Sequence, residues 1–156
     1  MRENSFSHIH DERAKMVDIS DKRDVKRRAV ASGEIRLKPE TIEAIKNREI
    51  VKGEVLETAR IAAVMAVKQT SSVIPMCHQI PVTGIDVKFE IADEVIKATV
   101  EVKSVGKTGV EMEALHGVSV ALLTIWDMVK SAEKDETGNY PHTGIRDIRV
   151  LEKSKK

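Results

Sequence analysis

The chain has 156 residues, the size of one ordinary domain and long enough to bury a hydrophobic core. With 26 basic and 25 acidic side chains its net charge is +1, so no overall field draws it toward nucleic acid or acidic lipid. Aromatic residues make up only 3% of the chain, too few for a base-stacking surface, and the single cysteine excludes an internal disulfide.

The first 15 residues are polar and of mixed charge, which predicts a flexible arm (residues 1–15) before a single domain over residues 16–153. Within this arm His8 and His10 could chelate a metal only with further ligands, and no third ligand is near in sequence. The arm lacks the apolar core of a secretory signal, and no apolar run approaches the roughly 20 residues of a membrane span. We therefore expect a cytoplasmic protein without membrane or nucleic-acid partners.

The first half of the domain predicts one strand and two helices. Apolar residues alternate with charged ones over residues 25–37, which favours a strand. A proline opens the next segment and isoleucines follow three apart, so we expect a short helix over residues 39–47. Small residues at helical spacing predict a longer helix over residues 54–70, and Pro75 prevents its continuation.

The second half predicts a hairpin, a long helix and a last strand. Residues 85–91 and 96–103 alternate strictly and flank a short turn, which indicates an antiparallel hairpin. A helix over residues 110–132 and a strand over residues 145–151 follow. This order is that of an α+β ferredoxin-like sandwich, with helices packed on one face of an antiparallel sheet. The other face keeps enough apolar positions that we expect an oligomer.

The long helix is apolar on one broad side and carries a narrow polar seam on the other. Small residues separate sparse ionisable ones in this seam, which indicates close approach by a ligand or by a neighbouring chain. The seam consists of Glu113, His116, Gly117, Val120, Thr124, Asp127 and Lys130. Glu113 and Asp127 lie roughly 21 Å apart along a helix, so either the ligand is elongated or two subunits share each site, and we favour the second.

Two further motifs admit plain structural explanations. Gly106-Lys107-Thr108 resembles the end of a P-loop but lacks the required upstream glycine, so it is either a simple helix entry or a local anion site. Cys77 and His78 are sequence neighbours, and their side chains would diverge in extended chain, which makes a catalytic dyad or a metal site improbable. The flanking prolines, Pro75 and Pro81, nevertheless stiffen this loop.

Four separated motifs together resemble the molybdenum cofactor biosynthesis protein C family, the cyclic pyranopterin monophosphate synthases. The likeness extends from Met16 to Lys153. The motifs are residues 52–62, beginning Lys-Gly-Glu-Val, then Ile74-Pro75-Met76-Cys77-His78, then residues 106–115, and finally residues 123–130.

The resemblance implies a ferredoxin-like lyase that converts a cyclic dihydro-GTP intermediate, 3',8-cyclo-7,8-dihydro-GTP, to cyclic pyranopterin monophosphate and releases diphosphate. It also implies a radical-SAM enzyme that supplies this substrate, and a homohexamer, a trimer of dimers, with sites at subunit boundaries. No cofactor is certain, and assistance by Mg²⁺ is left open. The alternative is a non-catalytic ferredoxin-like module that binds a nucleotide or assists assembly; an RNA-binding domain of this fold would need aromatic residues on its strands.

Matched motifs also imply the site residues. The catalytic set would be Asp127, Lys130 and Lys52, with Asp127 and Lys130 moving protons. The substrate-binding set would be Met76, Cys77, His78, Glu111, Met112, Glu113 and Lys68. Lys52, Lys68 and Lys130 could balance the charge of the triphosphate. The family's Lys-Ser-Gly-Gly-Lys ending is replaced here by Ser154-Lys155-Lys156, which puts any substrate contact from the tail in doubt; Trp126 and Val129 stand where tyrosine and cysteine are common.

Overall fold

Four long strands and two long helices form the body of the computed structural model, which describes residues 9–10 and 13–156. A two-residue pair of strands precedes them at the N-terminal end. The elements in chain order are β1 (Ile9–His10), β2 (Arg13–Ala14), β3 (Val25–Arg36), α1 (Pro39–Lys46), α2 (Val55–Lys68), α3 (Thr70–Val73), β4 (Val82–Ile91), β5 (Val95–Gly106), α4 (Glu111–Glu133) and β6 (Gly144–Lys155).

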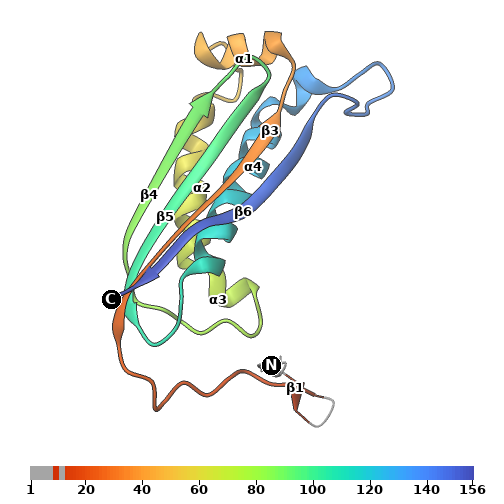
Figure 1. Ribbon diagram of the computed structural model, residues 1–156. Coiled ribbons are helices and arrows are strands. Elements are labelled where there is room, and N and C mark those ends of the chain that lie inside the picture. Colours follow the sequence, from red (N-terminus) through yellow and green to blue (C-terminus); the bar gives the residue numbers. More distant parts are fainter. Residues whose placement is uncertain (1–8, 11–12) are drawn as a thin grey trace.

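The four long strands form one antiparallel sheet in the order β4-β5-β3-β6. The two central strands, β3 and β5, are separated in the chain by α1, α2, α3 and β4. Helices α2 and α4 lie together on one face of the sheet (Figure 1). This arrangement confirms the predicted α+β sandwich with a ferredoxin-like order. Every predicted strand and helix of the domain is present.

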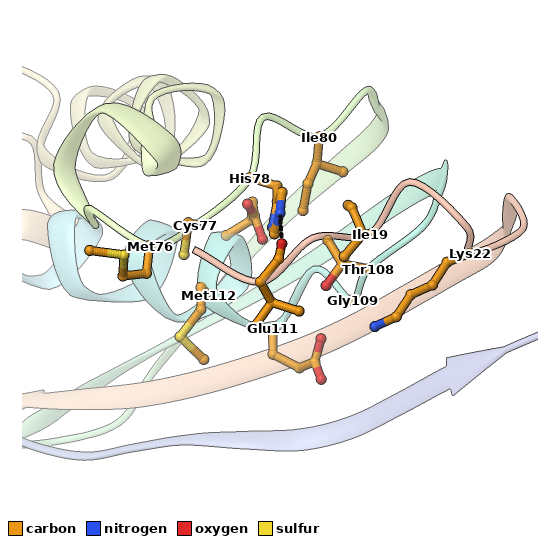
Figure 2. Close-up of a pocket in the computed structure, with 12 residues that line it drawn as sticks. Ile19, Lys22, Met76, Cys77, His78, Ile80, Thr108, Gly109, Glu111 and Met112 are labelled. Carbon is orange, nitrogen blue, oxygen red and sulfur yellow. Dashed lines mark hydrogen bonds between the residues drawn. The ribbon is translucent and has the colours of Figure 1, made fainter. Parts of the chain in front are cut away.

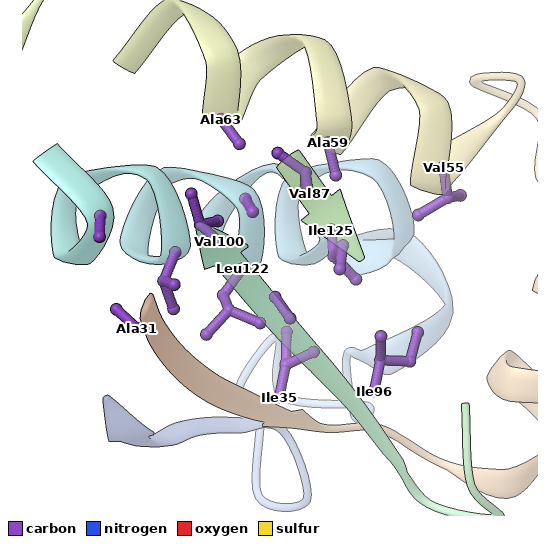
Figure 3. Close-up of a cluster of buried hydrophobic side chains, with 14 of the residues drawn as sticks. Ala31, Ile35, Val55, Ala59, Ala63, Val87, Ile96, Val100, Leu122 and Ile125 are labelled. Atoms are coloured by element: carbon purple, nitrogen blue, oxygen red, sulfur yellow. The ribbon is translucent and has the colours of Figure 1, made fainter. Parts of the chain in front are cut away.

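The core fills the space between that sheet face and the two helices (Figure 3). Strand β3 contributes alternate residues such as Ala31 and Ile35, and α4 contributes Leu122 and Ile125, all without exposed surface. Burying a side chain as large as leucine or isoleucine stabilises a fold by roughly 1.5–3 kcal/mol. The predicted apolar stripe of α4 is confirmed as the side that faces the sheet.

Small residues bring α2 and α4 into close contact. A Cβ added at Gly117 of α4 would lie 2.9 Å from Val67 Cγ2 and 3.5 Å from the Ala63 carbonyl oxygen, both on α2. Part of the polar seam is therefore covered by the same chain, and Gly117 serves helix packing rather than a ligand or a neighbouring chain. His116 of the seam is likewise bound internally, with Nδ1 3.1 Å from the Thr70 hydroxyl.

The C-terminal end of α4 is fixed by a buried carboxylate. Glu133 has no exposed surface, and its Oε1 accepts a hydrogen bond of 3.0 Å from the backbone N–H of Lys38, where α1 begins. The Thr143 hydroxyl donates to Oε2 of the same side chain. One acidic residue thus ties the end of the long helix to the starts of α1 and β6.

Two predicted elements have different bounds in the structure. The helix predicted over residues 54–70 ends at Lys68, and after Gln69 a separate turn, α3, follows, in which the Thr70 hydroxyl bonds to the carbonyls of Ala66 and Val67. Strand β6 continues to Lys155 rather than residue 151. A register shift against β3 and the positive φ of Asp147 (55°) interrupt its alternation, so the sequence pattern hides its true length.

The uncovered face of the sheet is more charged than the sequence indicated. Its outward positions form ion pairs such as Arg28–Glu101 (2.5 Å), Arg28–Glu152 (2.7 Å) and Arg146–Glu34 (3.2 Å). Exposed apolar side chains lie instead mainly on the helices and along β6. They include Ile61, Met65, Val73, Met112, Leu123, Ile148, Val150 and Leu151.

Contrary to the sequence-based expectation, α4 is long and apolar enough to meet the length and composition criteria for a membrane span. Half of its most apolar stretch is buried in the protein, and its contacts with the sheet and α2 account for its hydrophobicity. His8 of the predicted arm lies outside the described residues, and for His10 only the backbone is described.

Candidate functional site

A pocket of about 400 Å³ opens at the N-terminal end of α4, between that helix, the loop after α3 and the chain that precedes β3 (Figure 2). We call it the N-end pocket. It is lined by Val17, Ile19, Lys22, Met76, Cys77, His78, Ile80, Thr108, Gly109, Glu111, Met112 and Glu113. Six of these are the predicted substrate-binding residues from two separate motifs, so the fold brings both motifs to one place.

The loop that carries Met76, Cys77 and His78 is shaped by its own turn. The N–H of Cys77 donates to the Ile74 carbonyl oxygen at 3.1 Å, and Pro75 between them prevents helix. All three side chains are half-buried at the pocket. His78 Nε2 lies 2.7 Å from the Val17 carbonyl oxygen, a contact drawn as the dashed line in Figure 2.

The first turn of α4 places two carboxyl groups at the N-end pocket, those of Glu111 and Glu113, and their pKa values are shifted in opposite directions. Glu113 is only 3% exposed, and burial raises its pKa, with a smaller contribution from the negative charge of Glu111. Burial would also raise the pKa of Glu111, but a 2.7 Å hydrogen bond from Lys153 Nζ and nearby positive charge outweigh it and leave that pKa lowered. A Cβ at Gly109 would meet the Glu111 carboxylate, so a larger residue there would displace that side chain from its present position.

Cys77 contributes an unreactive thiol to this pocket. Burial, and to a smaller extent the charge of Glu113, raises the pKa of Cys77 above its usual value, which leaves little thiolate at neutral pH. The thiol therefore serves as a small, weakly polar part of the wall.

The predicted catalytic residues meet at the opposite end of α4. Asp127 accepts from Lys130 Nζ at 2.7 Å and from Lys52 Nζ at 2.9 Å, and Lys52 also donates to the Asp127 carbonyl oxygen at 2.8 Å. We call this the lysine–aspartate cluster. Lys130, and secondly Lys52, lower the pKa of Asp127 to about 2, while Asp127 raises the pKa of Lys130. Both shifts oppose proton transfer within the pair, so the cluster as it stands is a fixed pair of ammonium groups around one carboxylate.

The two groups of residues do not form one site within the chain. Glu113 and Asp127 lie on the same unbroken helix, fourteen residues and hence roughly 21 Å apart. Lys68 belongs to neither group, since it lines a separate hollow of about 410 Å³ beside Ile80 and the start of β4.

Several pocket residues escaped the sequence-based prediction. Val17, Ile19 and Lys22 reach the pocket from far away in sequence, and no local pattern marks them. Thr108 belongs to the glycine-flanked loop that we considered as an anion site, and the structure places that loop in the pocket wall. Lys153 contacts Glu111 from the end of β6, so the residue just before the Ser154-Lys155-Lys156 tail reaches the rim of the pocket.

Among residues 13–156, no three His, Cys, Asp or Glu side chains gather in a way that could hold a metal ion. The polar groups described above are ammonium, imidazole and carboxylate groups, which are suited to binding an anionic small molecule and to moving protons.

A ferredoxin-like sandwich with a half-buried, acid-lined pocket and a separate cationic cluster defines a small-molecule enzyme rather than a nucleic-acid-binding domain. The family model described as "MoaC family" matches residues 16–156 of the chain. Curated relatives called probable cyclic pyranopterin monophosphate synthase are 68% identical in Methanosarcina mazei (98% of both chains), 64% in Methanospirillum hungatei (96% of both) and 55% in Pyrococcus furiosus (96% of both). The chain belongs to the MoaC family, which confirms the predicted family and the predicted lyase class in molybdenum cofactor biosynthesis.

Proposed function

We propose that the chain converts the cyclic dihydro-GTP intermediate to cyclic pyranopterin monophosphate with release of diphosphate. One observation supports this assignment. The residues expected for the family gather into two groups, the N-end pocket and the lysine–aspartate cluster, at two places along α4. A non-catalytic nucleotide-binding or assembly module is not favoured, because it would need neither the buried Glu113 nor two lysines held around Asp127.

We propose further that the N-end pocket of one copy and the lysine–aspartate cluster of another copy together form each active site. The 21 Å separation prevents one compact reacting centre from touching both groups of the same chain. Apolar side chains are exposed beside both: Met112 (41%) next to Glu113, and Leu123 (58%) one turn before Asp127. Such side chains favour burial against a second copy. The proposed assembly is a hexamer built as a trimer of dimers.

Each group has a distinct proposed role. Met76, Cys77, His78 and Met112 hold the ring system, and Glu113, kept protonated more readily by burial, donates a proton during ring rearrangement. Glu111 orients Lys153 at the rim. Lys52 and Lys130 stabilise the negative charge that develops as diphosphate leaves, and Asp127 holds both in place. Lys68, in a separate hollow that shares Ile80 with the N-end pocket, adds positive charge from that side. We propose that a radical-SAM enzyme supplies the substrate and that the reaction takes place in the cytoplasm.

The first test is diphosphate release from the cyclic dihydro-GTP intermediate. Asp127→Asn should abolish turnover while leaving the oligomer intact by analytical ultracentrifugation. Lys52→Met and Lys130→Met should each lower turnover by about 100-fold or more, the order found when one charge-stabilising group is removed. Tight binding of the intermediate by the unmodified protein, without diphosphate release, would favour the non-catalytic module.

A mixing experiment tests the shared site. Glu113→Gln subunits retain an intact lysine–aspartate cluster, and Asp127→Asn subunits retain an intact N-end pocket. If two copies share each site, random mixing of two inactive variants restores about a quarter of the sites. Mixed oligomers that remain inactive, or a monomer with full activity, would contradict the shared site.

A further inference from the structure

The chain that precedes β3 forms one wall of the N-end pocket. Val17, Ile19 and Lys22 line it together with residues of α4 and of the loop after α3. We call residues 17–22 the strap. Figure 2 shows it crossing the pocket in front of His78, with Lys22 at the opposite end of the pocket from Met76. None of the roles proposed above uses a residue of this segment.

The strap has a defined shape held by its own hydrogen bonds. Asp18 Oδ1 accepts from the backbone N–H of Ser20 at 2.8 Å and from its hydroxyl at 2.6 Å, which closes a tight turn. These bonds also lower the pKa of Asp18. The N–H of Lys22 donates to the Ile19 carbonyl oxygen at 3.1 Å and continues the turn.

The strap is also bound to the two other segments that form the pocket. Lys107, in the loop before α4, donates from Nζ to the Ser20 carbonyl oxygen at 2.8 Å. The Val17 carbonyl oxygen lies 2.7 Å from His78 Nε2, in the loop after α3. Three segments far apart in sequence are thereby joined around one pocket.

The contact with Val17 determines which nitrogen of His78 carries the proton. A carbonyl oxygen can only accept a hydrogen bond, so Nε2 must be the donor. In the neutral ring Nδ1 is then left with its lone pair and can accept a proton or a hydrogen bond. A histidine fixed in this way differs chemically from one that is free to exchange tautomers.

Lys22 brings a positive charge to the same wall. The other charged groups of the pocket are two carboxylates, one of which already pairs with Lys153 and one of which is kept more readily protonated by burial. An ammonium group is a strong donor for phosphate oxygen. Its position on the strap, away from the methionines, suits the phosphate-bearing end of a nucleotide-derived ligand better than the ring end.

We propose that the strap is a working part of the substrate pocket: Val17 is a positioning residue that holds His78 as the Nε2–H tautomer, and Lys22 binds a phosphate oxygen of the substrate. This inference rests on the proposed function of the N-end pocket. Under this proposal the strap takes part in substrate recognition and does more than connect the N-terminal residues to β3.

Steady-state kinetics of Lys22→Met test the charge on the strap. Because a hydrogen bond to a charged group contributes about 1.5–3 kcal/mol, KM should rise about 10-fold to 100-fold, with a much smaller change in kcat. Lys22→Arg should recover most of the loss. Lys15→Met is the matched control, an exposed lysine two residues before the strap and outside the pocket lining, and should behave as the unmodified protein.

Imidazole ¹⁵N NMR of the full chain tests the positioning of His78, with its signals assigned by their loss in His78→Gln. The expected result is the Nε2–H tautomer, with exchange between tautomers in Asp18→Ala, which opens the turn beside Val17. An Nδ1–H tautomer in the unmodified protein would overturn the positioning role.

Glu113→Gln separates a failure of the strap from a failure of the proposed function. If Lys22→Met keeps its KM while Glu113→Gln is inactive, the role of Lys22 is overturned and the pocket assignment stands. If both variants have full activity, the pocket itself is not the substrate site and the strap proposal falls with it.

Discussion

The two ends of α4 carry carboxylates whose protonation is shifted in opposite directions. Glu113, at the start of the helix, is buried, and burial raises its pKa. Asp127, near the end, is exposed, and the ammonium groups of Lys130 and Lys52 lower its pKa to about 2. One helix thus presents a carboxyl group whose pKa is raised and another that has lost its proton at any ordinary pH.

This contrast shows that position on a helix does not decide the chemistry of an acid. The helix dipole favours a charged carboxylate at the N-terminal end, where Glu113 lies, yet desolvation outweighs the dipole there. Asp127 lies too far from the C-terminal end for the dipole to matter, and two lysines keep it charged. The local environment of each side chain, and not its place along the helix, assigns the proton donor and the permanently charged group.

The largest effect is expected from a change at the helix crossing that positions the N-terminal end. In Gly117→Val the added atoms would press on Val67 and on the backbone of Ala63. Overpacking of this kind costs about 1–3 kcal/mol, so Tm should fall by roughly 2–10 °C in calorimetry. Because α2 leads into the loop that carries His78, substrate KM should rise as well.

Ser131→Ala is the control for this change, since Ser131 is exposed on the same helix. It should leave both Tm and KM unchanged. An unchanged Tm in Gly117→Val would mean that α2 can move away from α4 without cost, and that the crossing does not position the pocket.

The next largest effect is expected in how the stability of the protein depends on pH through Glu113, at the N-terminal end of α4. The folded-state pKa of Glu113 is raised above 4.5, so its contribution to stability is fully present below about pH 4.5 and is lost as the pH rises through the folded value. Glu113→Gln is neutral at every pH. We therefore expect its Tm to exceed that of the unmodified protein at neutral pH, with the difference shrinking as the pH falls to 4.5. A difference that grows toward acid would contradict the burial of a protonated group.

The smallest effect, and one of opposite sign, is expected at the exposed end. The pKa of Asp127 falls from 3.8 in the unfolded chain to about 2, so its contribution is present above pH 3.8 and is lost as the pH falls through about 2. Asp127→Asn should lower Tm slightly at neutral pH and match the unmodified protein near pH 2.

Salt separates this ion pair from a carboxylate that is stabilised by hydrogen bonds from uncharged groups. At 1 M salt the screening length is about 3 Å, so the effect of Asp127→Asn should largely disappear. Asp135→Asn is the comparison variant, because hydrogen bonds from Thr137 and Asn139 lower the pKa of Asp135. Its effect should persist in salt; equal salt sensitivity of the two variants would count against the lysine–aspartate cluster.

The sequence predicted the elements whose pattern is local. The hairpin of β4 and β5 follows from strict alternation, and the sheet-facing side of α4 follows from helical periodicity. The true length of β6 was missed, because its last residues are charged and are ordered by pairing with β3 rather than by their own pattern. The break at Gln69 was missed because no helix-breaking residue stands there, and the nearest proline is Pro75.

The residues of the candidate site were also only partly predictable from the sequence. Residues within recognisable motifs, such as His78 and Glu113, were predicted, and the structure places them in one pocket. Val17 was not, because its role depends on a single carbonyl group 61 positions from His78, and a backbone atom leaves no mark in a sequence. Lys153 was missed because the sequence gives no indication of where a terminal strand will end relative to α4.

Strand β6 lies at an open edge of the sheet, and its composition disfavours the pairing of another strand with that edge. Asp147, with its left-handed backbone, interrupts the regular spacing of main-chain groups that another extended chain would need in order to add on. The lysines at positions 153 and 155 place charge along the same border, which disfavours uncontrolled sheet growth. Copies of this protein that meet are thus guided toward side-chain contacts of limited number, and away from fibrils.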